Sequence, residues 1–433
     1  MEDAKRDIKR VSWLFLASLA LHLAYLYSPW PIRNHFPMDE GMYWDLASNL
    51  VEKSRLCLSG NAFATVGAEE RTLFWTPAYP ILLAAILKLG IDPPRVIGIV
   101  QAVMTSSLPV LLFPVARLVL QGKWLFLFLA FSAAYPYYFQ LSSEVGSEVT
   151  ALFLSLACLA LALATSKRTL SVPLLGTFAA WLCLSRPEFL VFSLLLLGWF
   201  VARNLAFPGQ VSGRSLVVLL LAFSFWMGLW LYRNYTVTET LAFTTRSGYS
   251  LAYQNEYYDA FSKGRMRSQE EWIQSFPEFA TEMERFRYLE GRSFRFIREH
   301  PGIYLQLCGK RIVSFFLPQA AKQGIYRMLG RKDIKETHIP FWFRMSNWFF
   351  LVPLWLLVMP AVLVSARRFK SSLDAVLSPP GLLALLILGQ FAVYGIFAYI
   401  EYQRSIMDME IFLLGVFLVA GKPGSPMARL SKG

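Results

Sequence analysis

The stretch RSLVVLLLAFSFWMGLWLY (residues 214–232) decides the fold class of this protein. Its last 18 residues, 215–232, carry no charged side chain. An α-helix needs about 20 consecutive apolar residues to cross the hydrocarbon core of a bilayer. Similar stretches recur along the chain, at residues 11–29, 96–116, 124–141, 148–166, 171–186, 188–206, 346–365, 380–400 and 405–420. The sequence therefore predicts an all-α polytopic membrane protein with about 10–11 transmembrane helices.

The composition agrees with this class. Of the 433 residues, 55% are hydrophobic and 16% are charged, whereas a soluble protein carries about 25% charged residues. The net charge of +13 is spread over short clusters between apolar stretches, as the positive-inside rule expects, and forms no contiguous basic face. An ordinary water-soluble enzyme is excluded, and a nucleic-acid-binding protein is disfavoured. The four cysteines form no CxxC pair and the four histidines no HExxH motif, which argues against a zinc or redox site.

The topology depends on the stretch 73–91, which is apolar but interrupted by Pro77 and Pro80. If it does not cross the membrane, all the basic clusters fall on one side, at residues 5–10, 117–123, 167–168, 203–214, 367–370 and 422–432. If it crosses, the later clusters lie opposite the first. The charge rule therefore predicts an interfacial or re-entrant helix here.

Three parts of the chain follow from this topology. Residues 1–232 form an N-terminal transmembrane catalytic module, with a first outer loop at 30–95. Residues 233–345 form a mostly helical region on the outer face, since so long a polar segment is unlike a structureless loop; its charge-rich run Ser268–His300 ends at Pro301. Residues 346–433 supply the last transmembrane helices and a cytoplasmic tail.

Two adjacent carboxylates, Asp39 and Glu40, open an aromatic-rich segment in the first outer loop. On a helix both lie close to the face of Tyr43. Adjacent helical residues point about 100° apart, so one of the pair faces a reacting group. A carboxylate there can act as general base. The alternative is that Asp39 caps the helix and Glu40 favours its first turn.

Further polar residues gather at the same outer ends of the spans. They are Tyr79, Glu144, Glu148, Arg186, Arg233, Asn234, Tyr402 and Arg404. A single arginine at a span end often serves only to snorkel to the interface. Several arginines together with carboxylates instead indicate a site for a phosphorylated, membrane-embedded substrate.

The ordered set of motifs resembles the GT-C glycosyltransferases of the protein O-mannosyltransferase and bacterial lipid A aminoarabinose transferase superfamily. The motifs are Asp39-Glu40 with Tyr43 and Ala47, Trp75–Pro80, Ser147-Glu148, Ser185-Arg186-Pro187, Arg233-Asn234-Tyr235, Gly248-Tyr249 with Asn255, Ile297–Tyr304, and Tyr402 with Arg404. Two motifs depart from the family pattern: Phe74-Trp75-Thr76-Pro77 stands for its Arg-Pro-Pro, and Tyr402-Gln403-Arg404 for its Arg-Tyr-Arg.

The resemblance implies a GT-C-like bundle with an outer helical cap. It implies an inverting transfer of a sugar from a polyprenyl-phosphate donor to a hydroxyl of a lipid, glycan or protein acceptor. Asp39 and Glu40 would be catalytic, and the other polar residues at the outer rim would bind substrate. The expected location is a prokaryotic inner membrane, with the site facing the extracytoplasmic side of the cell envelope.

Other functions remain open at this stage. A flippase or transporter would show internal repeats and ionisable residues at mid-membrane depth, whereas the charges of this chain are expected to cluster at span ends, which counts against that class. A polyprenyl-phosphate hydrolase would want a His or Ser nucleophile, and His35 is the histidine near the carboxylate pair. No cofactor is certain; the two carboxylate pairs could hold a divalent metal ion or bind sugar hydroxyls.

Overall fold

The structure, a computed structural model, describes residues 2–28, 37–59, 71–90, 93–164, 171–207, 211–257, 259–260, 269–316, 376–396 and 403–420. The predicted span 346–365 and the basic clusters at 167–168, 367–370 and 422–432 lie outside these ranges.

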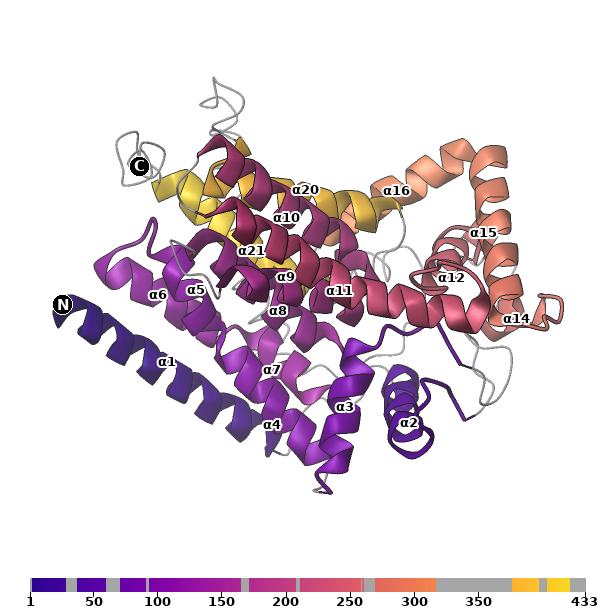
Figure 1. Cartoon of the computed structure of the whole chain (residues 1–433), viewed down its shortest axis with the longest axis horizontal. Coiled ribbons are helices and arrows are strands. Elements are labelled where there is room, and N and C mark those ends of the chain that lie inside the picture. Colours follow the sequence, from indigo (N-terminus) through magenta and orange to yellow (C-terminus); the bar gives the residue numbers. More distant parts are fainter. Residues whose placement is uncertain are drawn as a thin grey trace, which may run out of the picture.

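Every regular element in the described part of the chain is a helix, beside an isolated antiparallel bridge between Cys57 and Arg71. The all-α prediction is therefore confirmed (Figure 1). The elements are α1 (Glu2–Leu26), α2 (Pro37–Lys53), α3 (Ala78–Lys88), α4 (Pro93–Ser106), α5 (Leu108–Ala116), α6 (Gly122–Ala133), α7 (Pro136–Ser143), α8 (Glu148–Ala164), α9 (Ser171–Ser185), η1 (Pro187–Phe189), α10 (Leu190–Ala206), α11 (Gly213–Thr238), α12 (Arg246–Ala252), η2 (Tyr253–Tyr257), α14 (Gln269–Gln274), α15 (Glu282–Glu299), α16 (Pro301–Phe316), α20 (Pro379–Ile396) and α21 (Gln403–Ala420).

Three helical stretches in the described residues are both long and apolar enough to cross a membrane: Pro94–Ala116, Pro187–Ala206 and Gly213–Thr238. The shorter apolar helices there have 10–17 residues. The predicted span 124–141 is divided between α6 and α7. A residue before proline is driven toward extended backbone, and Tyr135, which precedes Pro136, has φ −65° and ψ 113°. The protein is a polytopic helical membrane protein.

The two ends of the bundle can be assigned from α1 and α6. The guanidinium of Arg10, near the start of α1, lies 5.0 Å from the ring centroid of Phe126, near the start of α6. These two basic segments therefore share one end. Helix α3 has 11 residues and is about 16 Å long, about half the thickness of the hydrocarbon core. Both observations are what a non-crossing 73–91 segment requires.

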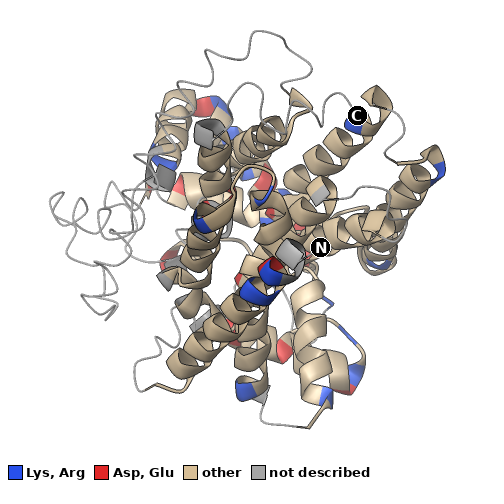
Figure 2. Cartoon of the chain, turned by 90° about the vertical axis from the view of Figure 1, so that its left-hand side faces the viewer, with Lys and Arg blue, Asp and Glu red and all other residues tan. Residues whose placement is uncertain are grey.

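Helices α9 and α11 approach each other closely through a glycine. A Cβ atom on Gly176 would lie 2.3 Å from the carbonyl oxygen of Leu219, so a larger residue would force the helices apart. Small residues at such contacts are typical of helices packed in membranes. The opposite side of α11 exposes Val217, Leu221 and Phe225. These side chains suit contact with lipid, and Figure 2 shows how little of the helical ribbon is charged.

A group of polar helices lies at the right of Figure 1, away from the N-terminus. We call α12, η2, α14 and α15 the helical cap. The predicted charge-rich run 268–300 is here two helices, α14 and α15, and the Thr281 hydroxyl caps α15 by accepting a hydrogen bond from the backbone amide of Glu284. A hydroxyl at this position satisfies a backbone N–H that the helix itself leaves without a partner.

Candidate active site

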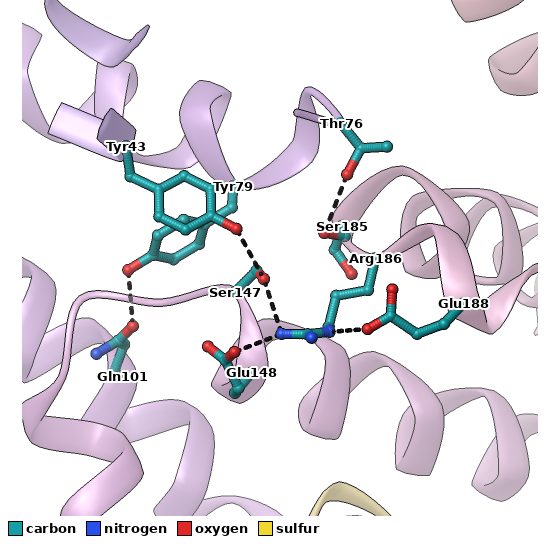
Figure 3. A network of polar contacts seen from close by, with 9 residues as sticks. All are labelled: Tyr43, Thr76, Tyr79, Gln101, Ser147, Glu148, Ser185, Arg186 and Glu188. Carbon is teal, nitrogen blue, oxygen red and sulfur yellow. Dashed lines mark hydrogen bonds and ion pairs between the residues drawn. The ribbon is translucent and has the colours of Figure 1, made fainter. Parts of the chain in front are cut away.

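Helix α2 presents the predicted catalytic pair. Its backbone is helical from Pro37, so Asp39 and Glu40 lie in its first turn, and the side chain of Glu40 is half-buried. The side chain of Asp39 lies outside the described part. One turn further, Tyr43 is buried and its hydroxyl donates a 3.1 Å hydrogen bond to Oγ of Ser147. Helix α2 is thereby attached to the start of α8, as Figure 3 shows.

The centre of this network is Arg186, whose side chain is 3% exposed. Its Nε donates to Oε1 of Glu188 at 2.7 Å, and its Nη1 donates to Oγ of Ser147 at 3.3 Å and forms an ion pair with Glu148. Burying a guanidinium is costly unless it is paired and hydrogen-bonded. The two carboxylates supply that pairing, so the arginine is fixed in position (Figure 3).

The extended backbone of Arg186 explains how one side chain reaches both carboxylates. Helix α9 ends at Ser185, Arg186 has φ −148° and ψ 115°, and Pro187 starts η1. Proline favours both the extended residue before it and the first position of a helix. The Ser185-Arg186-Pro187 motif therefore encodes a break between two helices that turns the guanidinium toward α8.

A second set of contacts places α3 against the same site. The Tyr79 hydroxyl donates to Oε1 of Gln101 at 3.0 Å, and the Gln101 amide donates to the carbonyl oxygens of Ser142 and Glu144. The Tyr43 and Tyr79 ring centroids are 4.8 Å apart. Glu144 therefore enters this network through its backbone. Figure 3 shows both tyrosines beside Ser147.

Burial and nearby charges determine the protonation of Tyr43. Loss of solvent raises the pKa of its hydroxyl to about 12, and the positive charges of Arg246 and Arg186 oppose this shift. The hydroxyl is therefore neutral near pH 7 and acts as a hydrogen-bond donor.

Arg233 and Asn234 form a separate set of contacts from the network around Arg186. Nη1 of Arg233 donates to the carbonyl oxygen of Thr72 at 3.0 Å and to Oδ1 of Asn234 at 3.0 Å. Asn234 is fully buried, and its amide donates to the carbonyl oxygen of Ala242 at 2.9 Å. These described contacts attach the first loop and the start of the cap to the end of α11.

The remaining predicted residues are only partly described. Arg404 lies in the first turn of α21, and its side chain is outside the described part of the chain. Tyr402 lies wholly outside the described residues. The structure thus brings together Tyr43, Tyr79, Glu148 and Arg186. The assignment of the other substrate-binding residues stays a prediction.

A cavity of about 550 Å³ lies beside the Arg186 network. Its wall is mostly apolar, and Glu188 and Arg246 both line it. The guanidinium of Arg246 lies 5.0 Å from the ring centroid of Trp75, and that ring lies 5.0 Å from Tyr43. The lining residues are Pro187, Glu188, Leu190, Val191, Thr240, Leu241, Ala242, Phe243, Thr244, Arg246, Ser247, Ser250, Phe286 and Val393.

Sequence reasoning missed Glu188 and Arg246. Each lies close to a motif that the sequence did single out, Ser185-Arg186-Pro187 and Gly248-Tyr249. A charged residue one or two positions from a motif was the sequence feature that could have identified them. The sequence could not show that the two residues line the same cavity, because they lie 58 positions apart.

The expectation that charges keep to span ends is wrong for α21. Asp408 and Glu410 lie inside this apolar helix and are both fully buried. The Tyr135 hydroxyl donates to Oδ2 of Asp408 at 2.6 Å, and the Ser155 hydroxyl donates to Oε1 of Glu410 at 3.0 Å. Buried carboxylates are tolerated because neighbouring helices supply these donors.

The described residues contain no group of three or more His, Cys, Asp or Glu side chains placed to hold a metal ion.

Among solved structures, the chain has a weak structural similarity to a membrane protein. No family model matches the chain, and no curated protein is similar to it. The crystal structure of ArnT from Cupriavidus metallidurans, bound to undecaprenyl phosphate, is similar with a TM-score of 0.40 and 13% identity. The match covers 95% of this chain and 78% of that one. Similarity at this level is too low to carry a conclusion about activity.

Proposed function

We propose that this protein is an integral-membrane glycosyltransferase that uses a polyprenyl-phosphate-linked sugar as donor. The observation that carries the proposal is the position of the apolar 550 Å³ cavity beside a buried cluster of ionised side chains, with Glu188 belonging to both. A lipid-linked sugar phosphate has matching parts: its apolar chain suits the cavity, and its charged, hydroxylated head suits the charged cluster.

The charges of the site suit a phosphate leaving group. Arg186 is already paired with Glu148 and Glu188, and Arg246 is the basic side chain among the described residues that line the cavity, so the single negative charge of a donor phosphodiester meets a guanidinium there. A guanidinium can bind two phosphate oxygens at once. As the bond between sugar and phosphate breaks, negative charge grows on the phosphate, and a fixed guanidinium stabilises it. We assign this contact to Arg246, which lines the cavity.

The carboxylates of α2 supply the other half of the reaction. The acceptor hydroxyl must lose a proton as its oxygen attacks the anomeric carbon, and Asp39 accepts that proton as general base. The first turn of α2 is held one helical turn from the Tyr43–Ser147 hydrogen bond. Attack from the side opposite the departing phosphate inverts the anomeric configuration. The acceptor is a hydroxyl of a lipid, glycan or protein on the extracytoplasmic side.

The experiment uses the purified full-length protein in lipid nanodiscs with polyprenyl phosphates that carry mannose, glucose or aminoarabinose, together with lipid, oligosaccharide and peptide hydroxyl acceptors, and follows attachment of the sugar to an acceptor. We expect release of polyprenyl phosphate from at least one donor, and loss of that release in Asp39→Asn. Polyprenyl phosphate itself should raise the melting temperature, because a ligand that binds the folded state stabilises it.

A cavity-filling variant links that binding to the site. Leu241→Trp should abolish the rise in melting temperature, because Leu241 lines the cavity and is 72% exposed, so the larger ring can enter the cavity without disturbing the core. Leu305→Trp, at a similarly exposed leucine outside the lining, is the control. Release of inorganic phosphate would instead identify a hydrolase, and movement of an intact donor across the bilayer a transporter; either result would overturn the proposal.

A further inference from the structure

The helical cap contains a second and larger cavity, of about 700 Å³, that the proposed reaction does not use. It lies between η2 with the residues that follow it and the second half of α15. Its lining is Glu256, Asp259, Ala260, Arg287, Tyr288, Gly291, Arg292, Arg295, Phe296, Glu299 and His300. The volume falls in the range of small-molecule sites, about 300–1,000 Å³.

Among the described residues that line this cavity, positive and negative charges balance. Three guanidiniums (Arg287, Arg292 and Arg295) face three carboxylates (Glu256, Asp259 and Glu299). A site for inorganic phosphate or another ligand with two or more negative charges would favour an excess of basic groups. The equal supply of donors and acceptors instead suits a neutral ligand rich in hydroxyl groups, because each hydroxyl both donates and accepts.

One wall of the cavity is rigid and polar. Nε of Arg292 donates to Oε2 of Glu256 at 2.5 Å, and Nη2 forms an ion pair with Oε1 of the same carboxylate. Nη1 of Arg292 donates to the Tyr288 hydroxyl at 3.0 Å. This pairing fixes polar atoms before any ligand binds, so little entropy is lost when the ligand arrives.

The same face of α15 offers apolar surface between its polar groups. Tyr288, Gly291, Arg292 and Arg295 are spaced three or four residues apart and so share one side of the helix, and Phe296 also lines the cavity. A Cβ atom on Gly291 would meet no atom within 4 Å. This side of the cavity thus combines two aromatic rings with open space above Gly291. Aromatic rings can pack against the C–H faces of sugar units, and the charged side chains beside them can bind the sugar hydroxyls.

We propose that this cavity binds a neutral oligosaccharide, the part of a glycan acceptor that does not react; this acceptor role rests on the proposed glycosyl transfer. Arg246, which lines the 550 Å³ cavity, and Glu256, which lines this one, belong to the consecutive helical segments α12 and η2. Ten residues of helix span about 15 Å. A glycan of several sugar units can therefore occupy the cap while its terminal hydroxyl reaches the transfer site.

Binding is measured first, with the full chain in nanodiscs and no donor. The probes are maltotetraose, cellotetraose and mannotetraose, with an acidic hyaluronan tetrasaccharide and inorganic phosphate for comparison, in isothermal titration calorimetry. We expect at least one neutral tetrasaccharide to bind. Arg295→Ala should weaken this binding about tenfold, as expected for a hydrogen bond to a charged group. Arg298→Ala, at an exposed arginine of the same helix outside the lining, should not change it.

A second variant guards against indirect effects. Gly291→Leu fills open space, so it should abolish binding without lowering the melting temperature. Binding of none of the neutral probes, binding of the acidic probes only, or equal affinity in Arg295→Ala and Arg298→Ala would overturn the inference. Sugar binding without any donor consumption would defeat the proposed transfer and leave the glycan site standing. Sugar transfer without any glycan binding would defeat the glycan site and leave the proposed transfer standing.

Discussion

The carboxylate of Glu282 accepts a hydrogen bond from the backbone amide of Leu73, with 2.9 Å between Oε1 and N, across 209 positions of sequence. The same Oε1 accepts from the Thr245 hydroxyl at 2.5 Å. Glu282 is 5% exposed. One buried side chain of α15 therefore joins two helices of the cap, α15 and α12, and attaches them to the segment that leads into α3, where Trp75 packs on Tyr43.

Replacing Glu282 should loosen the cap from the first loop. In Glu282→Ala, the Leu73 amide and the Thr245 hydroxyl lose an acceptor in a buried place, which costs about 1–3 kcal/mol for each unsatisfied group. We expect a lower melting temperature and faster amide hydrogen exchange over 71–77. Glu278→Ala, at an exposed glutamate just before α15, is the matched control. Unchanged exchange in Glu282→Ala would show that this contact does not hold the segment.

The general base assignment predicts a large loss of rate at Asp39. Asp39→Asn should lower transfer about 10²–10⁴-fold, as removal of a general base does, while polyprenyl phosphate still raises the melting temperature. Glu40→Gln should be milder, since neighbouring helical residues point about 100° apart. The measurement is the single-turnover rate at saturating donor. Near-normal turnover in Asp39→Asn would refute the assignment.

The phosphate contact predicts that Arg246 cannot be replaced by lysine. Lysine keeps the charge but lacks the planar guanidinium that binds two oxygens. Arg246→Lys should therefore raise KM for the donor, or lower kcat if the contact tightens as charge develops. Arg404→Lys, in the first turn of α21, tests in the same assay the prediction that Arg404 also binds substrate. Arg233→Lys should act mainly on stability, because the described contacts of Arg233 are with carbonyl oxygens and with the Trp230 ring. Normal donor kinetics in Arg246→Lys would remove Arg246 from the phosphate site.

The close approach of α9 and α11 predicts a strong effect of one methyl group. Gly176→Ala would place a Cβ atom 2.3 Å from the Leu219 carbonyl oxygen, so the helices must separate, and overpacking of this kind costs about 1–3 kcal/mol. We expect a lower melting temperature in detergent. Gly198→Ala in α10 is the control, because its Cβ would meet nothing within 4 Å. Equal stability of the two variants would contradict the packing described here.

The topology predicts which exposed positions label together. In a cysteine-free background, Lys53→Cys and Leu241→Cys should react with a membrane-impermeant maleimide from one side. Leu205→Cys, at the basic end of α10, should react from the other side. All three side chains are exposed, so burial does not limit the reaction. Labelling of Leu205→Cys and Leu241→Cys from the same side would overturn the topology.

Local sequence was sufficient for several features. The uncharged residues 215–232 predicted α11 because no charged side chain interrupts a stretch of spanning length. Pro77 and Pro80 predicted that the apolar segment 73–91 is interrupted, and α3 within it is indeed short. Proline removes a backbone donor and starts helices more readily than it continues them. The helical state of Asp39 and Glu40 was likewise predicted, because this property depends on neighbours within one or two turns.

The tertiary structure decided which side chains meet. Arg186 at the end of a span reads as a snorkelling residue, yet it is 3% exposed and held between Glu148 and Glu188. Asp408 and Glu410 went unnoticed because the donors that make their burial possible, Tyr135 and Ser155, lie 273 and 255 positions away. Apolar length is a sum over consecutive residues and can be read along the chain. The cost of a buried charge depends on partners brought by other helices, so it is set only when the helices pack.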